Sequence, residues 1–118
     1  MSGTVFISTG TSWGTQSRVF LAIVERIRSG YIESGEDAPE ELFSPLDSDL
    51  DFISLEELSR DDFRKFVAAS ESQLNRLLRD ETFTWQDREF LATPWGELQS
   101  LLRQDVRFAR NSPADESG

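Results

Sequence analysis

Carboxylates are the residues of this sequence whose types and spacing most suggest chemistry. The alternate acids Asp47, Asp49 and Asp51 match the opening positions of a calcium-binding EF-hand loop. The rest of that loop is missing, because its sixth position requires glycine and is Phe52, and its twelfth requires glutamate and is Leu58. We therefore expect solvated loop carboxylates here, and a protein that needs neither a metal ion nor a cofactor.

The glycine-rich segment from Gly10 to Gly14 is a second candidate, because it joins an expected strand to an expected helix. Phosphate-binding loops occupy that position, but a P-loop also requires a lysine, and the single lysine of the chain is Lys65. A dinucleotide-binding loop would require a third glycine, which does not follow. A small anion could bind at the start of the helix, but a turn that caps this helix is favoured.

Histidine and cysteine are both absent, which excludes most enzyme mechanisms. Ser-His-Asp and Cys-His nucleophilic sites are impossible, and so are zinc sites built from the usual ligands. A pair of carboxylates can hydrolyse glycosides without histidine, but one of the two acids then needs apolar surroundings. The acids here cluster in a segment interrupted by prolines. A carboxylate-based hydrolase is therefore the weakest hypothesis, and we expect a protein that is not an enzyme.

The whole net charge of −10 comes from one segment, between Ser29 and Ser59. This segment contains ten carboxylates and neither lysine nor arginine, whereas the remaining residues carry twelve charges of each sign. A charge concentrated in this way speeds the encounter with a cationic protein, and apolar side chains then hold the complex. The alternative is that the acids serve only solubility. Apolar residues interleaved with the acids are Tyr31, Ile32, Leu42, Phe43, Leu46, Leu50, Phe52 and Ile53.

We predict that the acidic segment binds a basic protein partner, a toxin or a nuclease, by blocking its active site or an adjacent surface. Direct binding of nucleic acid is disfavoured, because an acidic chain repels phosphate backbones. Aromatic anchors supply most of the affinity in this hypothesis, and the carboxylates raise the association rate. The residues predicted to contact the partner are Tyr31, Asp37, Glu40, Glu41, Phe43, Asp47, Asp49, Asp51, Glu56 and Glu57.

Small size, acidity and the lack of cysteine are typical of proteins that neutralise a basic enzyme. The immunity proteins that protect bacteria from their own toxins are the leading example, and for such a protein we favour a monomer. The alternative is a small acidic secretion chaperone or adaptor, which would use an apolar groove and form a dimer. No run approaches the roughly 18 apolar residues that span a bilayer, and the N-terminus lacks the features of a signal peptide. A cytoplasmic location is expected.

The expected fold is mainly α: a small helical domain of three to four helices with a short N-terminal strand, or an α+β variant of it. Apolar periodicity predicts helices over Thr15–Ser29, Ser59–Arg79 and Thr93–Gln104. β-branched and apolar residues predict a strand over Thr4–Ser8. Residues 50–54 are left open as strand or loop, and residues 81–91 as strand or helix. One globular domain is expected over residues 1–110, followed by a disordered tail over 111–118.

Local signals predict where the helices begin and end. Gly30 is expected to end the first helix, Ser59 to cap the second, and Thr93 to cap a third helix that begins at Pro94. Leu78 is expected on the buried face of the second helix. The residues expected at the centre of the core are Phe20, Ile23, Val24, Ile27, Phe63, Phe66, Val67, Leu74, Leu77, Leu98 and Leu102.

Overall fold

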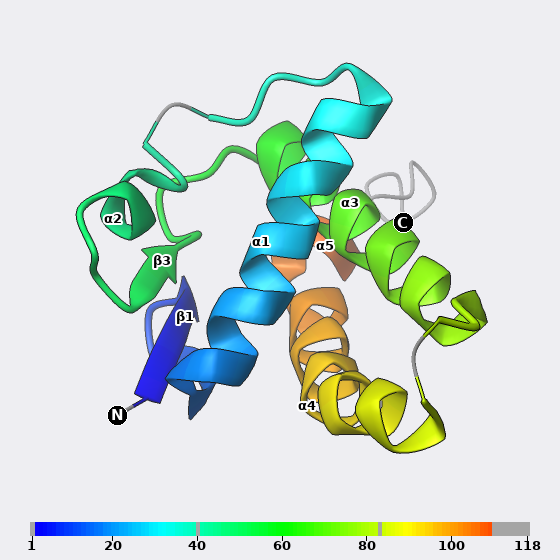
Figure 1. The fold of residues 1–118 in the computed structure, drawn as a ribbon. Coiled ribbons are helices and arrows are strands. Elements are labelled where there is room, and N and C mark those ends of the chain that lie inside the picture. The colour runs from blue at the N-terminus through cyan, green and yellow to red at the C-terminus, as the bar shows by residue number, and fades with distance from the viewer. Residues whose placement is uncertain (1, 40, 83, 110–118) are drawn as a thin grey trace.

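The computed structural model describes residues 2–39, 41–82 and 84–109, and this part of the chain folds into helices packed on a small sheet (Figure 1). The predicted, mainly α fold with its α+β alternative is confirmed. The predicted disordered tail, residues 111–118, lies outside the described residues. The long helices are α1 (Ser17–Ser34), α3 (Arg60–Arg79) and α4 (Trp85–Gln104), and the single-turn helices are α2 (Ser44–Asp47) and α5 (Val106–Ala109).

The sheet has three strands in the described residues, in the order β2-β1-β3. Strands β1 (Ser2–Ser8) and β2 (Thr11–Gln16) form an antiparallel hairpin, and β3 (Phe52–Ser54) joins β1 in parallel. The predicted N-terminal strand is confirmed, and the segment left open as strand or loop is a strand. The predicted turn from Thr9 to Gly14 is wrong beyond its first residues, because pairing with β1 extends most of that segment into β2.

One face of the sheet is covered by helices, and the other is open. Val5 and Ile7 of β1 point inward and are 0% and 1% exposed, whereas Phe6 between them is 38% exposed. Phe6 packs edge-to-face against Phe52 of β3 on the open side, with ring centroids 6.0 Å apart. The period of two in the burial of β1 is the pattern of a strand with one solvated face.

Helix α1 buries the predicted stripe of Val19, Phe20, Ile23, Val24 and Ile27. The helix does not end at Gly30, as predicted, but continues for one more turn to Ser34. Gly35 then ends it in the left-handed conformation, with φ of 75°, which suits glycine. Gly30 instead allows close packing against α3, because a Cβ there would lie only 3.1 Å from Cγ of Gln73.

Helix α3 follows the sequence signals most closely. Its boundary at Ser59 is confirmed, since the Ser59 hydroxyl accepts a hydrogen bond from the backbone N–H of Asp62 at 3.2 Å. Phe63, Phe66, Val67 and Leu77 are fully buried, as predicted. Two predictions on this helix are wrong: Leu74 is only partly buried, and Leu78 is 49% exposed. Helix α3 packs against both α1 and α4, and the stripe that it buries continues through Ser70, Gln73 and Leu77 instead of through Leu74 and Leu78.

The predicted start of the last long helix is wrong. Helix α4 begins at Trp85, where the Thr84 hydroxyl accepts a hydrogen bond from the N–H of Asp87 at 3.1 Å. Pro94 lies inside the helix. A proline there removes one helical hydrogen bond to the carbonyl four residues earlier, and that residue, Phe90, is 56% exposed. Water can therefore satisfy this carbonyl, which explains why the helix tolerates the proline.

A buried cluster of hydrogen-bonded polar side chains connects α4 to α3. The Trp95 indole donates to the Ser70 hydroxyl at 2.9 Å, and this hydroxyl donates to Oε1 of Gln99 at 2.6 Å. Nε2 of Gln99 donates to the backbone carbonyl of Val67 at 3.4 Å. Because these side-chain donors are all satisfied, the cluster fixes the register of the two helices without leaving a buried polar group unpaired.

Candidate functional site

The acidic segment forms one flank of the molecule. It leaves the end of α1, passes through α2 and β3, and returns to the start of α3, on the side of the fold away from α4 (Figure 1, cyan to green). We call residues 36–39 and 41–57 the acidic flank. Glu40, one of the residues predicted to contact a partner, lies outside the described residues. Helix α2 has a single turn, so the shape of this flank depends on what ties it to the longer helices.

Asp47 pairs with Arg28, which lies just before the acidic segment. Its two carboxylate oxygens accept hydrogen bonds from the two terminal nitrogens of Arg28 in α1, at 3.1 and 3.2 Å. The same guanidinium lies over the ring of Phe43, 5.4 Å from its centroid. The bond to Asp47 raises the pKa of Arg28 above its ordinary value. Arg28 therefore fixes α2 against α1, and Asp47 is less available to a partner than predicted.

Three other acids of the segment are also engaged within the fold. Glu36 pairs with Lys65 of α3 at 3.3 Å. Glu33 accepts hydrogen bonds from Arg76 and from Nε2 of Gln73, and the bond from Arg76 is the largest cause that lowers its pKa. Asp51 accepts a hydrogen bond from the Ser17 hydroxyl at 2.7 Å. The pairs of Glu36 and Glu33 are exposed, and exposed ion pairs contribute little stability, so the contacts of Glu36 and Asp51 serve mainly to hold the flank in place.

Five carboxylates of the acidic flank remain without a hydrogen bond or ion pair to any other residue that the structure describes. All of them are exposed. Asp49 adopts a positive φ of 62°, a conformation that aspartate tolerates better than most residues. The five are Asp37, Glu41, Asp49, Glu56 and Glu57, and they are the residues of the predicted contact set whose charges are free to meet a cationic surface.

The two predicted aromatic anchors lie in the core. Tyr31 and Phe43 are 2% and 3% exposed, and their rings meet edge-to-face with centroids 6.0 Å apart. Burial is the main cause that raises the pKa of the Tyr31 hydroxyl, followed by the charges of Asp62 and Glu36. In this structure the two rings are therefore not exposed for contact with a partner. They connect the flank to the core, because Phe43 directly precedes α2.

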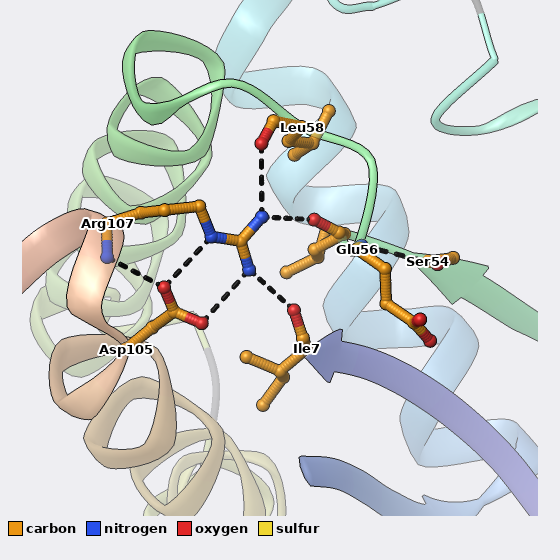
Figure 2. A network of polar contacts seen from close by, with 7 residues as sticks. Ile7, Ser54, Glu56, Leu58, Asp105 and Arg107 are labelled. Carbon is orange, nitrogen blue, oxygen red and sulfur yellow. Dashed lines mark hydrogen bonds and ion pairs between the residues drawn. The ribbon is translucent and has the colours of Figure 1, made fainter. Parts of the chain in front are cut away.

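Arg107 of α5 fixes the turn that carries Glu56 and Glu57 (Figure 2). Its guanidinium donates to the backbone carbonyls of Leu55 and Leu58, and to that of Ile7 at the end of β1. It also packs over the ring of Phe63, 4.0 Å from the centroid. The Glu56 side chain points away from this network and toward solvent (Figure 2).

Asp105 completes this network. Its carboxylate receives Nε of Arg107 at 2.9 Å and another guanidinium nitrogen at 3.0 Å, and its side chain is only 4% exposed. Sequence reasoning missed Arg107, because the spacing of two residues from Asp105 is the only local signal and the carbonyls lie 49 to 100 residues away. The network joins the C-terminal end of the described chain to both the sheet and the acidic flank.

We expect Arg107→Met to lower the free energy of unfolding by about 2–3 kcal/mol, because it removes the guanidinium from a nearly buried carboxylate, which keeps only the backbone N–H of residue 107, and removes the donor to three carbonyls. Urea unfolding followed by circular dichroism measures the change. Arg103→Met is the matched control, since Arg103 pairs with Glu71 at an exposed site and should cost less than about 1 kcal/mol. Equal losses in the two variants would contradict the role given to Arg107.

The pairing with Arg107 lowers the pKa of Asp105 below its ordinary value of 3.8. A lowered pKa in the folded state means that Asp105 stabilises the fold fully above pH 3.8 and loses this contribution as the pH falls through the folded pKa. We expect wild type to be more stable than Asp105→Asn near neutral pH, and the gap to close in acid below pH 3.8. Urea titrations at several pH values test this. A gap that stays constant down to strong acid would contradict it.

A groove of different character lies between the C-terminal turns of α1 and α3. It has a volume of about 700 Å³, and Arg26, Arg76 and Arg79 line it together with the carboxylates of Glu33 and Asp80. Hydrogen bonds from Thr82 are the largest cause that lowers the pKa of Asp80, and the charges of Arg26 and Arg88 add to it. This groove could hold an anionic group, but its two carboxylates offset most of the positive charge.

Two properties of the described residues bear on function. No helix among them is long and apolar enough to cross a membrane. No group of three or more carboxylates in the described ranges is arranged to hold a metal ion. Asp47 and Asp51 have separate partners, Arg28 and Ser17. They are the first and the last of the three alternate acids that match the opening of an EF-hand loop.

The fold is similar to that of a chain in a solved toxin–immunity complex. That structure is of the CdiA-CT toxin from Burkholderia pseudomallei E479 in complex with its cognate CdiI immunity protein. The similarity has a TM-score of 0.76 at 23% sequence identity, and it covers 90% of this chain and 98% of that chain. No protein-family model and no curated protein matches the sequence. At this identity the similarity establishes a shared fold.

Proposed function

We propose that this protein is an immunity protein that binds a basic toxin or nuclease, one to one, through its acidic flank. The observation that carries this proposal is the set of five exposed carboxylates with no partner among the described residues, on a flank held in place by Arg28, Lys65 and Arg107. Binding would cover the active site of the toxin or a surface next to it, in the bacterial cytoplasm. The shared fold with a chain of a toxin–immunity complex supports this assignment.

A flank held in place suits rapid and tight association. Ordering a loop upon binding costs free energy, and a loop that is already fixed avoids this cost. The unpaired carboxylates attract a cationic surface over a Debye length of about 8–10 Å and so raise the association rate. Each exposed pair formed at the interface contributes on the order of 1 kcal/mol or less. We therefore propose that the charges set the rate of association and the orientation in which the partner docks.

The same kind of complex contains a toxin, so this chain could be that component instead. The groove lined by Arg26, Arg76 and Arg79 is the observation that favours this second candidate, because guanidinium groups bind phosphate. The charge of the chain argues against a nuclease, since a protein with a net charge of −10 repels nucleic acid as a whole. The absence of histidine also removes the usual general base. The immunity role is therefore our proposal.

The test is co-expression in a bacterial host with the toxin domain encoded beside this protein's gene. We expect the toxin domain alone to stop growth, and this protein to restore growth and to form a one-to-one complex in gel filtration with light scattering. Growth arrest caused by this protein alone would assign it as the toxin. A stable dimer that binds a secreted substrate and leaves the toxin active would assign it as a chaperone.

A further inference from the structure

A groove opens on the acidic flank where three separate parts of the chain meet. Its walls come from the segment before and within α2, from the end of β3, and from the start of α3, and its volume is about 380 Å³. Apolar side chains supply much of the lining: Pro39, Leu42, Pro45 and Leu58. Leu42 is only 3% exposed, so the apolar floor is continuous with the core.

Three carboxylates stand around this apolar floor. They are Glu41, Glu57 and Asp62, and none has a hydrogen bond or ion pair from its carboxylate to another described residue. Other acids of the segment are already paired, as Asp47 is with Arg28 and Glu36 is with Lys65. Among the described residues that line the groove there is neither lysine nor arginine. The groove therefore combines an apolar floor with a negative rim that nothing in the described part of the chain neutralises.

We propose that this groove receives one arginine side chain of the basic partner. An arginine has an aliphatic stem and a charged head, so the stem would lie along Leu42, Pro45 and Leu58. The planar guanidinium can donate to two carboxylates at once, which a lysine ammonium does less well. This inference rests on the proposed function, and it names the feature of the partner that the acidic flank recognises.

The preference of the groove for an arginine side chain is tested with an amino acid whose two ends are blocked. N-acetyl-arginine methylamide is titrated into the labelled protein, and chemical shifts of the backbone amides are followed at constant ionic strength. The neutral probe is the citrulline derivative, which has nearly the same shape without the charge. We expect the arginine probe to shift the amides of Leu42, Ser54 and Leu58, and the citrulline probe to bind there about tenfold more weakly, since charge-assisted hydrogen bonds are roughly twice as strong as neutral ones.

Glu41→Gln combined with Glu57→Gln should weaken the arginine probe by about tenfold as well. Glu89→Gln combined with Glu97→Gln, on exposed positions of α4, should leave its binding unchanged. Equal shifts with both probes, or shifts centred on another surface, would overturn the inference. If the groove rejects arginine while the toxin domain still binds the acidic flank, only this inference fails. If the groove accepts arginine while no toxin is neutralised, the proposed function fails instead.

Discussion

Phe66→Ala should lower the free energy of unfolding by about 3–5 kcal/mol, the usual cost of deleting a fully buried aromatic ring. Phe66 is 0% exposed and lies on α3, the helix that contacts α1, α4 and α5. Its removal therefore leaves a cavity in the core. Because small domains are stable by only about 5–15 kcal/mol in total, this single change should bring the protein close to unfolding at ordinary temperatures.

Phe90→Ala is the matched control for this prediction. The substitution is chemically identical, but Phe90 is 56% exposed on α4, so we expect a change within about 0.5 kcal/mol. Urea unfolding of both variants, followed by fluorescence or circular dichroism, gives the comparison. A small effect at Phe66, or equal effects at the two positions, would show that the core is not centred on α3.

The second large effect is on association. We expect Glu41→Lys, Glu56→Lys and Glu57→Lys, combined in one variant, to slow association with the toxin domain by tenfold or more at low salt, within the range of about 10–10³ known for electrostatic steering. The remaining rate should depend less on salt than the wild-type rate does. The three residues were chosen because their carboxylates are unpaired and exposed, so their reversal leaves the ion pair of Asp47 with Arg28 intact.

The control variant reverses three glutamates elsewhere. Glu81→Lys, Glu89→Lys and Glu97→Lys act on exposed residues in the turn before α4 and along this helix. Both variants change the net charge from −10 to −4, because each reversal adds two units. Stopped-flow or surface-based kinetics at several salt concentrations separates local steering from total charge. Equal slowing in the two variants would mean that only the net charge matters, and no slowing in either would leave the acids a role in solubility alone.

The sequence was sufficient for those features that depend on neighbouring residues. The boundary at Ser59 follows from one hydroxyl and one backbone N–H three residues apart, and the stripe of α1 follows from helical periodicity. Helix boundaries were predicted wrongly at residues that are compatible with two local structures. Gly30 can end a helix or can let two helices approach, and here Gln73 of α3 requires the second. Pro94 can begin a helix or lie inside one whose preceding turn faces water.

The acidic flank could be located from sequence, but its internal organisation could not. Arg28 and Asp47 are 19 residues apart, and Arg76 and Glu33 are 43 apart, so no local pattern reveals which acids are paired. The burial of Tyr31 and Phe43 could not be predicted, because the segment has no periodicity that distinguishes an inward from an outward aromatic ring. Local sequence signals place Asp62 only in the first turn of α3. Its place beside Glu41 and Glu57 appears once three distant parts of the chain are brought together.

The fold is shared with a chain of a toxin–immunity complex, but a shared fold does not determine the partner. At 23% identity, a common backbone arrangement does not fix the side chains on the surface, and recognition depends on specific groups rather than on the fold. The contacts of Arg28 and Arg107 would keep the flank in one shape, while its exposed acids could differ between proteins that share the fold. The choice of partner would then depend on residues such as Glu41 and Glu57, whose carboxylates make no hydrogen bond or ion pair with other described residues.

Amide hydrogen exchange of this protein, alone and in complex with the toxin domain, is the measurement that locates the binding surface most directly. We expect complex formation to slow exchange across residues 41–58, which include α2, β3 and the turn held by Arg107. Exchange in α4, on the opposite side of the fold, should stay unchanged. Protection confined to α4, or to the groove lined by Arg26, Arg76 and Arg79, would contradict binding through the acidic flank.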